Sequence, residues 1–127
     1  MFDKCKTTTA QGNVGLGSAI AWFTANNYAV SIPLNDSQHY DLIVEFEGVL
    51  KTVQVKTTNY YTKAGSYKVE LRAGSTKGRR KNFSTTKVDY LFVLTANGNR
   101  YLIPSEQVAT DRSINVGKAK YLAWLLP

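Results

Sequence analysis

The chain has 127 residues, which is enough for one domain with a workable hydrophobic core. Its formal net charge is +7 and its isoelectric point is about 9.6, a basic balance that suits an anionic partner. Its single cysteine excludes an internal disulfide, and no apolar run reaches the roughly 18 residues that a transmembrane helix needs. We therefore expect one domain over residues 1–127 that works in the cytosol and makes no membrane contact.

The first element expected along the chain is a helix over residues 13–26. Its apolar residues recur at intervals of three and four, which is the period of a helix with one buried face. They are Leu16, Ala19, Ile20 and Phe23. A strand over residues 28–33 follows, and the polar stretch after it is typical of a turn. The helix is expected to pack on a sheet.

Two strand-like runs then meet at a Glu-Gly pair, residues 47–48, which suits a two-residue hairpin turn. This turn sets a register that places Asp41 directly opposite Gln54. Because side chains alternate between the two faces of a strand, Lys56 projects from the same face as Asp41 and Gln54. A carboxylate, an amide and an ammonium group therefore converge within two otherwise apolar runs, which is the pattern of a functional site.

The hairpin is followed by a tip, residues 58–65, that carries Tyr60 and Tyr61. These rings either stack on bases or sugars, or cover the edge of the sheet. Residues 66–72 alternate apolar and polar side chains, which predicts a strand with one buried face. The nearly continuous apolar run over residues 87–95 predicts a strand that is buried on both faces.

The last quarter of the chain begins with an Asn-Gly pair, residues 97–98, that predicts a hairpin turn into a strand over residues 100–103. A short helix is expected over residues 104–107. Residues 120–126 form a strand or a helix, and they are more apolar than a terminus needs, which favours a subunit contact.

The excess positive charge is concentrated in residues 60–90, where eight Lys and Arg residues against two acidic residues give a net charge of +6. Within this segment, residues 74–82 combine glycine, cations and small polar residues. This composition is typical of a loop that borders phosphates, and the alternative is a solvated surface loop. The residues expected to contact nucleic acid are Tyr60, Lys63, Arg72, Lys77, Arg79, Arg80 and Lys81.

The spacing of the three converging residues resembles the PD-(D/E)XK phosphodiesterase superfamily, in which an Asp opens one strand and an acid-x-Lys triplet lies on the next. Here the triplet reads Gln54-Val55-Lys56, and Gln in place of the acid resembles the tetrameric homing endonucleases encoded in group I introns. The resemblance covers most of the chain and is weakest over residues 60–87. Its matching segments are residues 12–15, 32–33, 40–44, 53–57, 88–93 and 101–104, with single matches at Ala19, Phe23, Tyr28 and Val30.

The resemblance implies an α/β fold with a restriction-endonuclease-like mixed β-sheet core and flanking helices. It also implies a site-specific, divalent-metal-dependent endonuclease that hydrolyses double-stranded DNA and belongs to the intron-homing kind. The expected assembly is a homo-oligomer, a tetramer or a dimer. Three rivals stay open: a Holliday-junction resolvase, a restriction-type nuclease, and a catalytically silent DNA-binding module.

The cofactor implied is Mg²⁺, or Mn²⁺ in its place. Mg²⁺ prefers oxygen ligands and keeps several waters, so few protein oxygens suffice. Asp41 is expected to bind it directly, with the backbone carbonyl of Val55 and the side-chain oxygen of Gln54 as further ligands. Lys56 is expected to orient the attacking water or to stabilise the reacting phosphate by charge. The structural alternative is a cross-strand ion pair between Asp41 and Lys56.

One departure from the family pattern concerns the first helix. Members commonly carry a Glu just after the second Gly of a Gly-x-x-Gly pattern, and this chain has Leu16 there. Residues 11–27 contain no acid at all. Three interpretations remain: another acid such as Glu45 or Glu70 completes the site, Gln11 lends an oxygen, or activity is low or lost.

Overall fold

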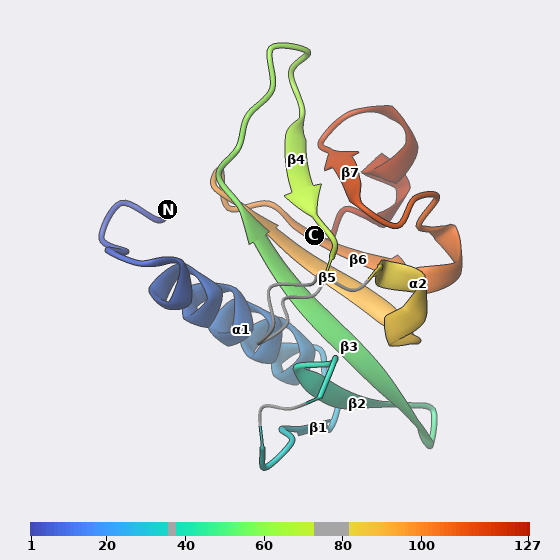
Figure 1. Cartoon of the computed structure of the whole chain (residues 1–127). Coiled ribbons are helices and arrows are strands. Elements are labelled where there is room, and N and C mark those ends of the chain that lie inside the picture. The colour runs from blue at the N-terminus through green and yellow to red at the C-terminus, as the bar shows by residue number, and fades with distance from the viewer. Residues whose placement is uncertain (36–37, 73–81) are drawn as a thin grey trace.

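A five-stranded sheet forms the centre of the molecule (Figure 1). Its strands lie in the order β1-β2-β3-β5-β6; β3 and β5 run parallel, and the other neighbouring pairs run antiparallel. The strand bounds are β1 Val30–Ser31, β2 Leu42–Phe46, β3 Val49–Thr58, β5 Tyr90–Thr95 and β6 Arg100–Pro104. The computed structural model describes residues 1–35, 38–72 and 82–127. The mixed sheet confirms the expected α/β class.

Helix α1, Thr8–Ala25, covers one face of the sheet (Figure 1). Thr7 caps it, because the Thr7 hydroxyl accepts a hydrogen bond from the N–H of Ala10 at 3.0 Å. The helix therefore begins five residues before the predicted start at residue 13, and that prediction was wrong. Its buried side chains pack on an apolar cluster under the helix that includes Leu42, Val44, Val53, Phe92 and Leu94.

The β2–β3 hairpin has the predicted register. Phe46 lies opposite Val49, and Leu42 lies opposite Val53. The turn residues Glu47 and Gly48 have φ values of 49° and 83°, and a two-residue turn of this kind needs positive φ at both positions. The last paired residues of β2 and β3 are Leu42 and Val53. Asp41 and Gln54 lie just beyond this pair, and from there β3 has no strand partner on its β2 side among the described residues.

The second half of β3 pairs with β5 along its other edge, from Val53 beside Tyr90 to Thr58 beside Thr95. As predicted, β5 is buried on both faces. Alternate residues of β5 enter two separate apolar clusters: Leu91 and Val93 in one, Phe92 and Leu94 in the other. This central position makes the β3–β5 pair the rigid support of the site.

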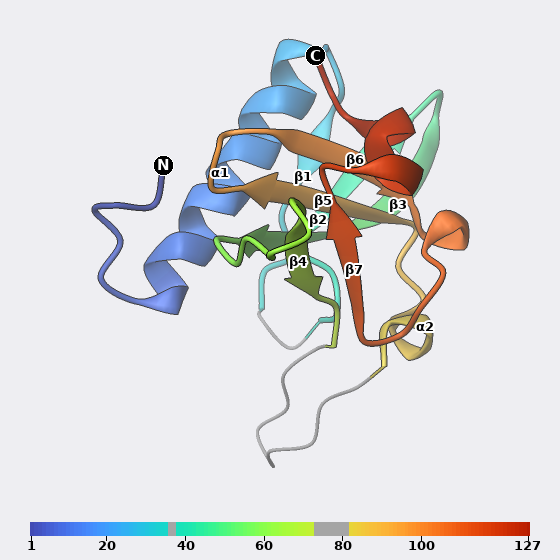
Figure 2. The same cartoon turned by 90° about the horizontal axis from the view of Figure 1, so that it is seen from above.

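A second, two-stranded antiparallel sheet lies on the face of the main sheet opposite α1 (Figure 2). Its strands are β4, Tyr67–Glu70, and β7, Ser113–Val116. The strand predicted over residues 66–72 is confirmed as β4, but β7 was not predicted. We call this pair of strands the ribbon. Its buried residues Val69, Leu71, Ile114 and Val116 pack with Leu91, Val93, Tyr101 and Ile103.

Short elements complete the described structure. They are α2, Phe83–Thr86, and two 3₁₀ helices, η1 Ser105–Gln107 and η2 Ala119–Trp124. η1 confirms the short helix expected after residue 104, and η2 shows that the C-terminal apolar run is helical up to Trp124. The strand expected over residues 28–33 is shorter in the structure, where β1 has only two residues. Among the described helices, none combines the length and the apolar character that crossing a membrane requires.

Candidate active site at the end of the hairpin

Asp41, Gln54 and Lys56 come together on the face of the sheet that α1 does not cover. α1 approaches β3 over Val55 and Thr57: a Cβ placed on Gly15 would lie 2.4 Å from the Thr57 methyl and 3.4 Å from Val55 Cγ1. Because side chains alternate along a strand, Gln54 and Lys56 point to the opposite face. The predicted convergence of the three residues therefore agrees with the backbone that carries them.

The Asp41 carboxylate is held against the edge of β3. Its Oδ2 accepts the backbone N–H of Val55 at 2.7 Å, and the Asp41 N–H donates to the carbonyl of Val53 at 2.9 Å. Burial raises the pKa of the Asp41 carboxyl, although the Val55 N–H and the positive charge of Lys56 both lower it. The protein alone thus leaves this carboxylate short of compensating charge.

Gln54 presents a buried oxygen beside Asp41. The residue is only 6% exposed, and its Oε1 has no hydrogen-bond partner among the described residues. A buried acceptor without a partner costs about 1–3 kcal/mol, so folded proteins rarely keep one without a reason. An amide oxygen is also a ligand that hard divalent cations accept. The donor set at this position therefore fits such a cation.

The backbone of Val55 faces the same edge. Its N–H points to Asp41, and in an extended strand the N–H and C=O of one residue point to the same side. The Val55 carbonyl therefore projects from the part of β3 that has passed the end of β2. Carboxylate, amide and backbone oxygens from Asp41, Gln54 and Val55 all lie at this edge.

Further acids are scarce around this cluster. Among the described residues, no group of three His, Cys, Asp or Glu side chains is placed to hold a metal ion. Glu45 lies on β2 four residues from Asp41, about 13 Å along the strand, which is too far to share one cation. Leu16 packs against the apolar cluster under α1. The first helix therefore supplies an apolar contact at Leu16 and no carboxylate.

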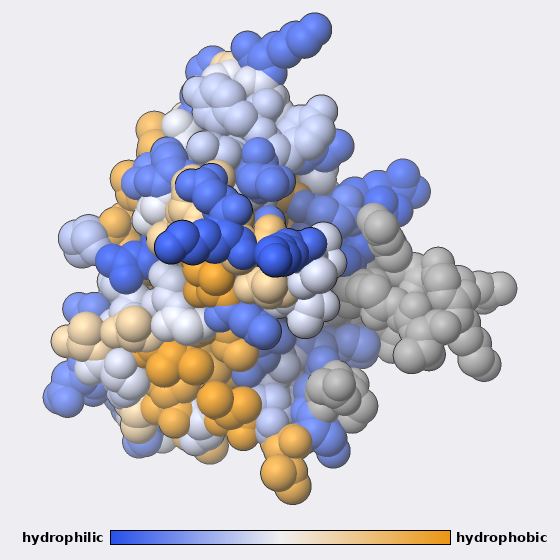
Figure 3. All heavy atoms as spheres, turned by 90° about the vertical axis from the view of Figure 1, so that its left-hand side faces the viewer, coloured by the Kyte–Doolittle hydropathy of each residue, from blue (hydrophilic) through white to orange (hydrophobic). Residues whose placement is uncertain are grey.

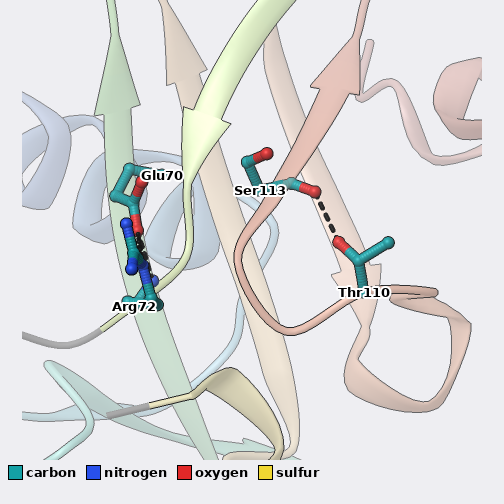
Figure 4. Close-up of polar contacts among 4 residues, drawn as sticks. All are labelled: Glu70, Arg72, Thr110 and Ser113. Carbon is teal, nitrogen blue, oxygen red and sulfur yellow. Dashed lines mark hydrogen bonds and ion pairs between the residues drawn. The ribbon is translucent and has the colours of Figure 1, made fainter. Parts of the chain in front are cut away.

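Two of the alternatives, Gln11 and Glu70, line one groove of about 290 Å³ at the end of β3. Gln11 Nε2 donates to the Thr57 hydroxyl at 3.0 Å, and Glu70 Oε1 pairs with Arg72 Nε at 2.7 Å. Figure 4 shows the Glu70–Arg72 pair, with Glu70 at the end of β4 and Arg72 just beyond it. Both side chains thus stand close to the free edge of β3, whereas Glu45 does not.

A family model for PD-(D/E)XK endonucleases matches residues 6–120. The chain belongs to this family. Its fold is similar to that of a solved bacterial homing endonuclease, I-Ssp6803I, with a TM-score of 0.68 and 22% identity over 90% of this chain and 78% of that one. No curated protein matches the sequence. The chain is therefore a nuclease with the restriction-endonuclease-like fold that the sequence predicted.

Membership of the PD-(D/E)XK family bears on whether the oxygens at this edge of β3 bind a metal. Nucleases of this family generally use divalent metals. The residues predicted from the sequence to form the family motif, Asp41 and the triplet Gln54-Val55-Lys56, all lie within the matched range. The unpartnered Oε1 of Gln54 is the feature that the sequence could not reveal, because burial depends on how segments distant in the sequence pack together.

Another acid, Asp89, is bound to Thr52 of β3, two residues before Gln54, which was not predicted from the sequence. Its Oδ2 accepts the N–H and the hydroxyl of Thr52 at 2.8 and 3.1 Å. The Asp89 N–H in turn donates to the Thr52 carbonyl at 3.1 Å. The carboxylate therefore fastens the start of β5 to β3, which is a structural role.

The residues predicted to contact DNA have mixed surroundings. Tyr60 and Lys63 are exposed at the tip between β3 and β4. Tyr61 is exposed as well, but its ring lies 4.9 Å from that of Tyr67 and partly covers the ribbon. Arg72 is paired with Glu70. The remaining predictions, Lys77, Arg79, Arg80 and Lys81, lie outside the described residues.

Proposed function

We propose that this nuclease is a site-specific, divalent-cation-dependent endonuclease of the homing kind that hydrolyses double-stranded DNA. The observation that carries the proposal is the buried Gln54 oxygen, which has no partner among the described residues and lies beside a carboxylate that burial leaves under-compensated. Both features disfavour the metal-free protein, and both are relieved by one cation at the edge of β3.

Each site residue then has a defined task. Asp41 binds the cation through its carboxylate, and the Gln54 side chain and the Val55 carbonyl add neutral oxygens. We expect Mg²⁺, with Mn²⁺ as a substitute, because the donors are all oxygens. When bound, the cation polarises the phosphate and lowers the pKa of a coordinated water. Lys56 places its ammonium near the attacking water and the charged phosphate oxygens.

The second acid of the site is proposed to be Glu70. It lies on the ribbon, on the same side of the sheet as Gln54 and Lys56, and it lines the groove at the end of β3. Gln11 lines the same groove and remains the alternative donor. Replacement of Glu70 by Gln should reduce cleavage if Glu70 serves the site, whereas Gln11→Ala should do so if Gln11 serves it.

A homo-oligomer, a tetramer or a dimer, fits this function because two strands must be cut and a long site must be read by a small chain. The side of the molecule that carries α1 shows a continuous apolar area in its lower part (Figure 3). Large apolar side chains are exposed near β1 and the β2–β3 turn: Ile32, Leu34, Val49 and Leu50. The fold similarity to I-Ssp6803I supports the homing assignment.

Cleavage of a substrate panel with Mg²⁺ tests the proposal against its rivals. The panel holds a randomised duplex library, a four-way junction and single-stranded DNA, and Asp41→Asn is the matched control. We expect double-strand cuts at one long sequence and none with Asp41→Asn. Preferred cutting of the junction would indicate a resolvase. Duplex cutting at a short recurring site would indicate a restriction-type nuclease. Binding without cutting at any Mg²⁺ or Mn²⁺ concentration would indicate a silent module.

A further inference from the structure

The ribbon has one apolar face and one polar face. Its apolar face packs on the main sheet through Val69 and Ile114, which lie opposite one another. The outward residues are also paired across the two strands. Lys68 lies opposite Asn115, and Glu70 lies opposite Ser113; Figure 4 shows the last two on neighbouring strands. We call these four residues the outer ribbon face; Lys68 and Asn115 are exposed, and Glu70 and Ser113 are half-exposed.

The size and chemistry of the outer ribbon face match the major groove of duplex DNA. Each strand has four residues, about 13 Å, and the major groove is about 12 Å wide and admits a two-stranded ribbon. Three of the four side chains, Lys68, Asn115 and Ser113, are of types that read base edges: Lys pairs with guanine, Asn pairs with adenine, and Ser serves either donors or acceptors. Glu70, the proposed second acid of the active site, is not counted among these readers.

The charge around the ribbon complements DNA. Lys63, Arg72 and Lys118 border it, and the Lys118 ammonium donates to the carbonyl of Ala64 at 2.5 Å, which holds it beside the tip. The cation-rich stretch after Arg72 is also attached here. The Leu71 N–H donates to the Arg112 carbonyl at 2.8 Å, and the Phe83 N–H to the Asp111 carbonyl at 3.2 Å. Both ends of that stretch therefore join the chain at one end of the ribbon.

The ribbon also stands at a suitable distance from the candidate active site. It lies on the same face of the sheet as Gln54 and Lys56, and the Thr58 hydroxyl donates to the Lys68 carbonyl at 2.5 Å. Thr58 is four residues from Gln54, about 13 Å along β3. Base pairs rise by about 3.4 Å, so a base read at Lys68 would lie about four base pairs from the cleaved phosphate.

We infer that the outer ribbon face enters the major groove and reads base pairs near the cut, with Lys68 and Asn115 as its exposed readers. This inference rests on the proposed function, because it takes duplex DNA as the substrate. Phosphate contacts by the surrounding cations hold the duplex, whereas the outer ribbon face determines which sequence is accepted.

Sequencing of the ends produced from a randomised duplex library with Mg²⁺ gives the wild-type preference profile. Lys68→Ala and Asn115→Ala should each lose about 5- to 150-fold of the discrimination at one or two positions, within about five base pairs of the cut. Other positions should keep their preference. Lys51→Ala, near the β2–β3 turn, and Asn13→Ala, on the exposed side of α1, are matched controls that should leave the profile unchanged.

Two results would overturn the inference while leaving the nuclease intact. One is a sequence-specific wild type whose profile neither ribbon variant alters. The other is a ribbon variant that binds all DNA sequences equally more weakly and whose affinity depends less steeply on salt concentration, because that behaviour indicates phosphate contacts. A wild type that cuts no duplex would instead contradict the proposed function. Cooperative thermal unfolding of each variant shows that the side-chain change left the fold in place.

Discussion

The ionisation of Asp41 is the clearest electrostatic feature at the residue scale. Desolvation raises the pKa of this carboxyl above 3.8 in the folded state, so the folded protein holds a proton more tightly than the unfolded chain. As pH rises from about 3.8 through the raised pKa, the ionised carboxylate therefore costs stability. The cost remains at neutral pH unless a cation offsets it.

Asp41→Asn should therefore stabilise the cation-free protein at neutral pH, and the gain should vanish as pH falls below 3.8. Asp111 provides the opposite case, because its hydrogen bonds from Ser84 lower the pKa of its carboxyl. Asp111→Asn should destabilise the protein at neutral pH. Urea unfolding across the acid-to-neutral range in EDTA measures both differences. A pH-independent effect of Asp41→Asn would contradict the assigned burial cost.

Gln54→Met tests the buried oxygen in the same site. Methionine has a similar length and no acceptor, so it removes the unpartnered oxygen and should raise the cation-free unfolding free energy by about 1 kcal/mol. The same change should strongly reduce Mg²⁺-dependent cleavage. Gln107→Met, at an exposed glutamine of η1, is the control and should be nearly neutral in both assays. A destabilised Gln54→Met protein with full activity would remove Gln54 from the site.

At the scale of elements, α1 supports the site by packing on the face of β3 opposite Gln54 and Lys56. Gly15 lets the helix lie directly on Thr57, where a Cβ would be 2.4 Å from Cγ2. Gln11 adds a hydrogen bond to the Thr57 hydroxyl at 3.0 Å. Any side chain at position 15 must push the helix from the strand that carries Gln54 and Lys56.

Gly15→Ala should therefore destabilise the protein by about 1–3 kcal/mol, as overpacking usually does. Gly12→Ala and Gly17→Ala are helical controls with open space around the added Cβ, and they should stabilise by about 0.4–1 kcal/mol. Thr57→Ser removes Cγ2 but keeps the hydroxyl, so it should recover part of the loss in the Gly15→Ala background. Additive effects of the two changes in urea unfolding would contradict the close contact.

The elements also show how far the sequence could predict this fold. The hairpin was predictable because a two-residue turn and the two-residue period of strands together fix which residues face each other. β7 was missed because Ser113, Asn115 and two apolar residues give a weak local signal; its partner β4 lies more than 40 positions away. The start of α1 was missed because the cap at Thr7 precedes a stretch with Gly12 and no apolar stripe.

The whole molecule combines a buried cluster of oxygens with a basic surface. The sequence could predict the convergence of Asp41, Gln54 and Lys56, because it depends on local register. It could not predict the burial of Gln54 or the position of Glu70, because both depend on how segments distant in the sequence pack together. The net charge of +7 already favours an anionic partner such as DNA, but only the fold places Lys68 in the groove at the end of β3 and Arg72 beside Glu70.

The most direct measurement of the central claim is the rate of duplex cleavage by the wild type and by Lys56→Ala, with Mg²⁺ and with excess EDTA. We predict cleavage by the wild type with Mg²⁺ alone. We also predict loss of cleavage by Lys56→Ala while its DNA affinity stays within a few fold, and no loss in the control Lys51→Ala. Cleavage by the wild type in excess EDTA, or by Lys56→Ala at the wild-type rate, would contradict the account.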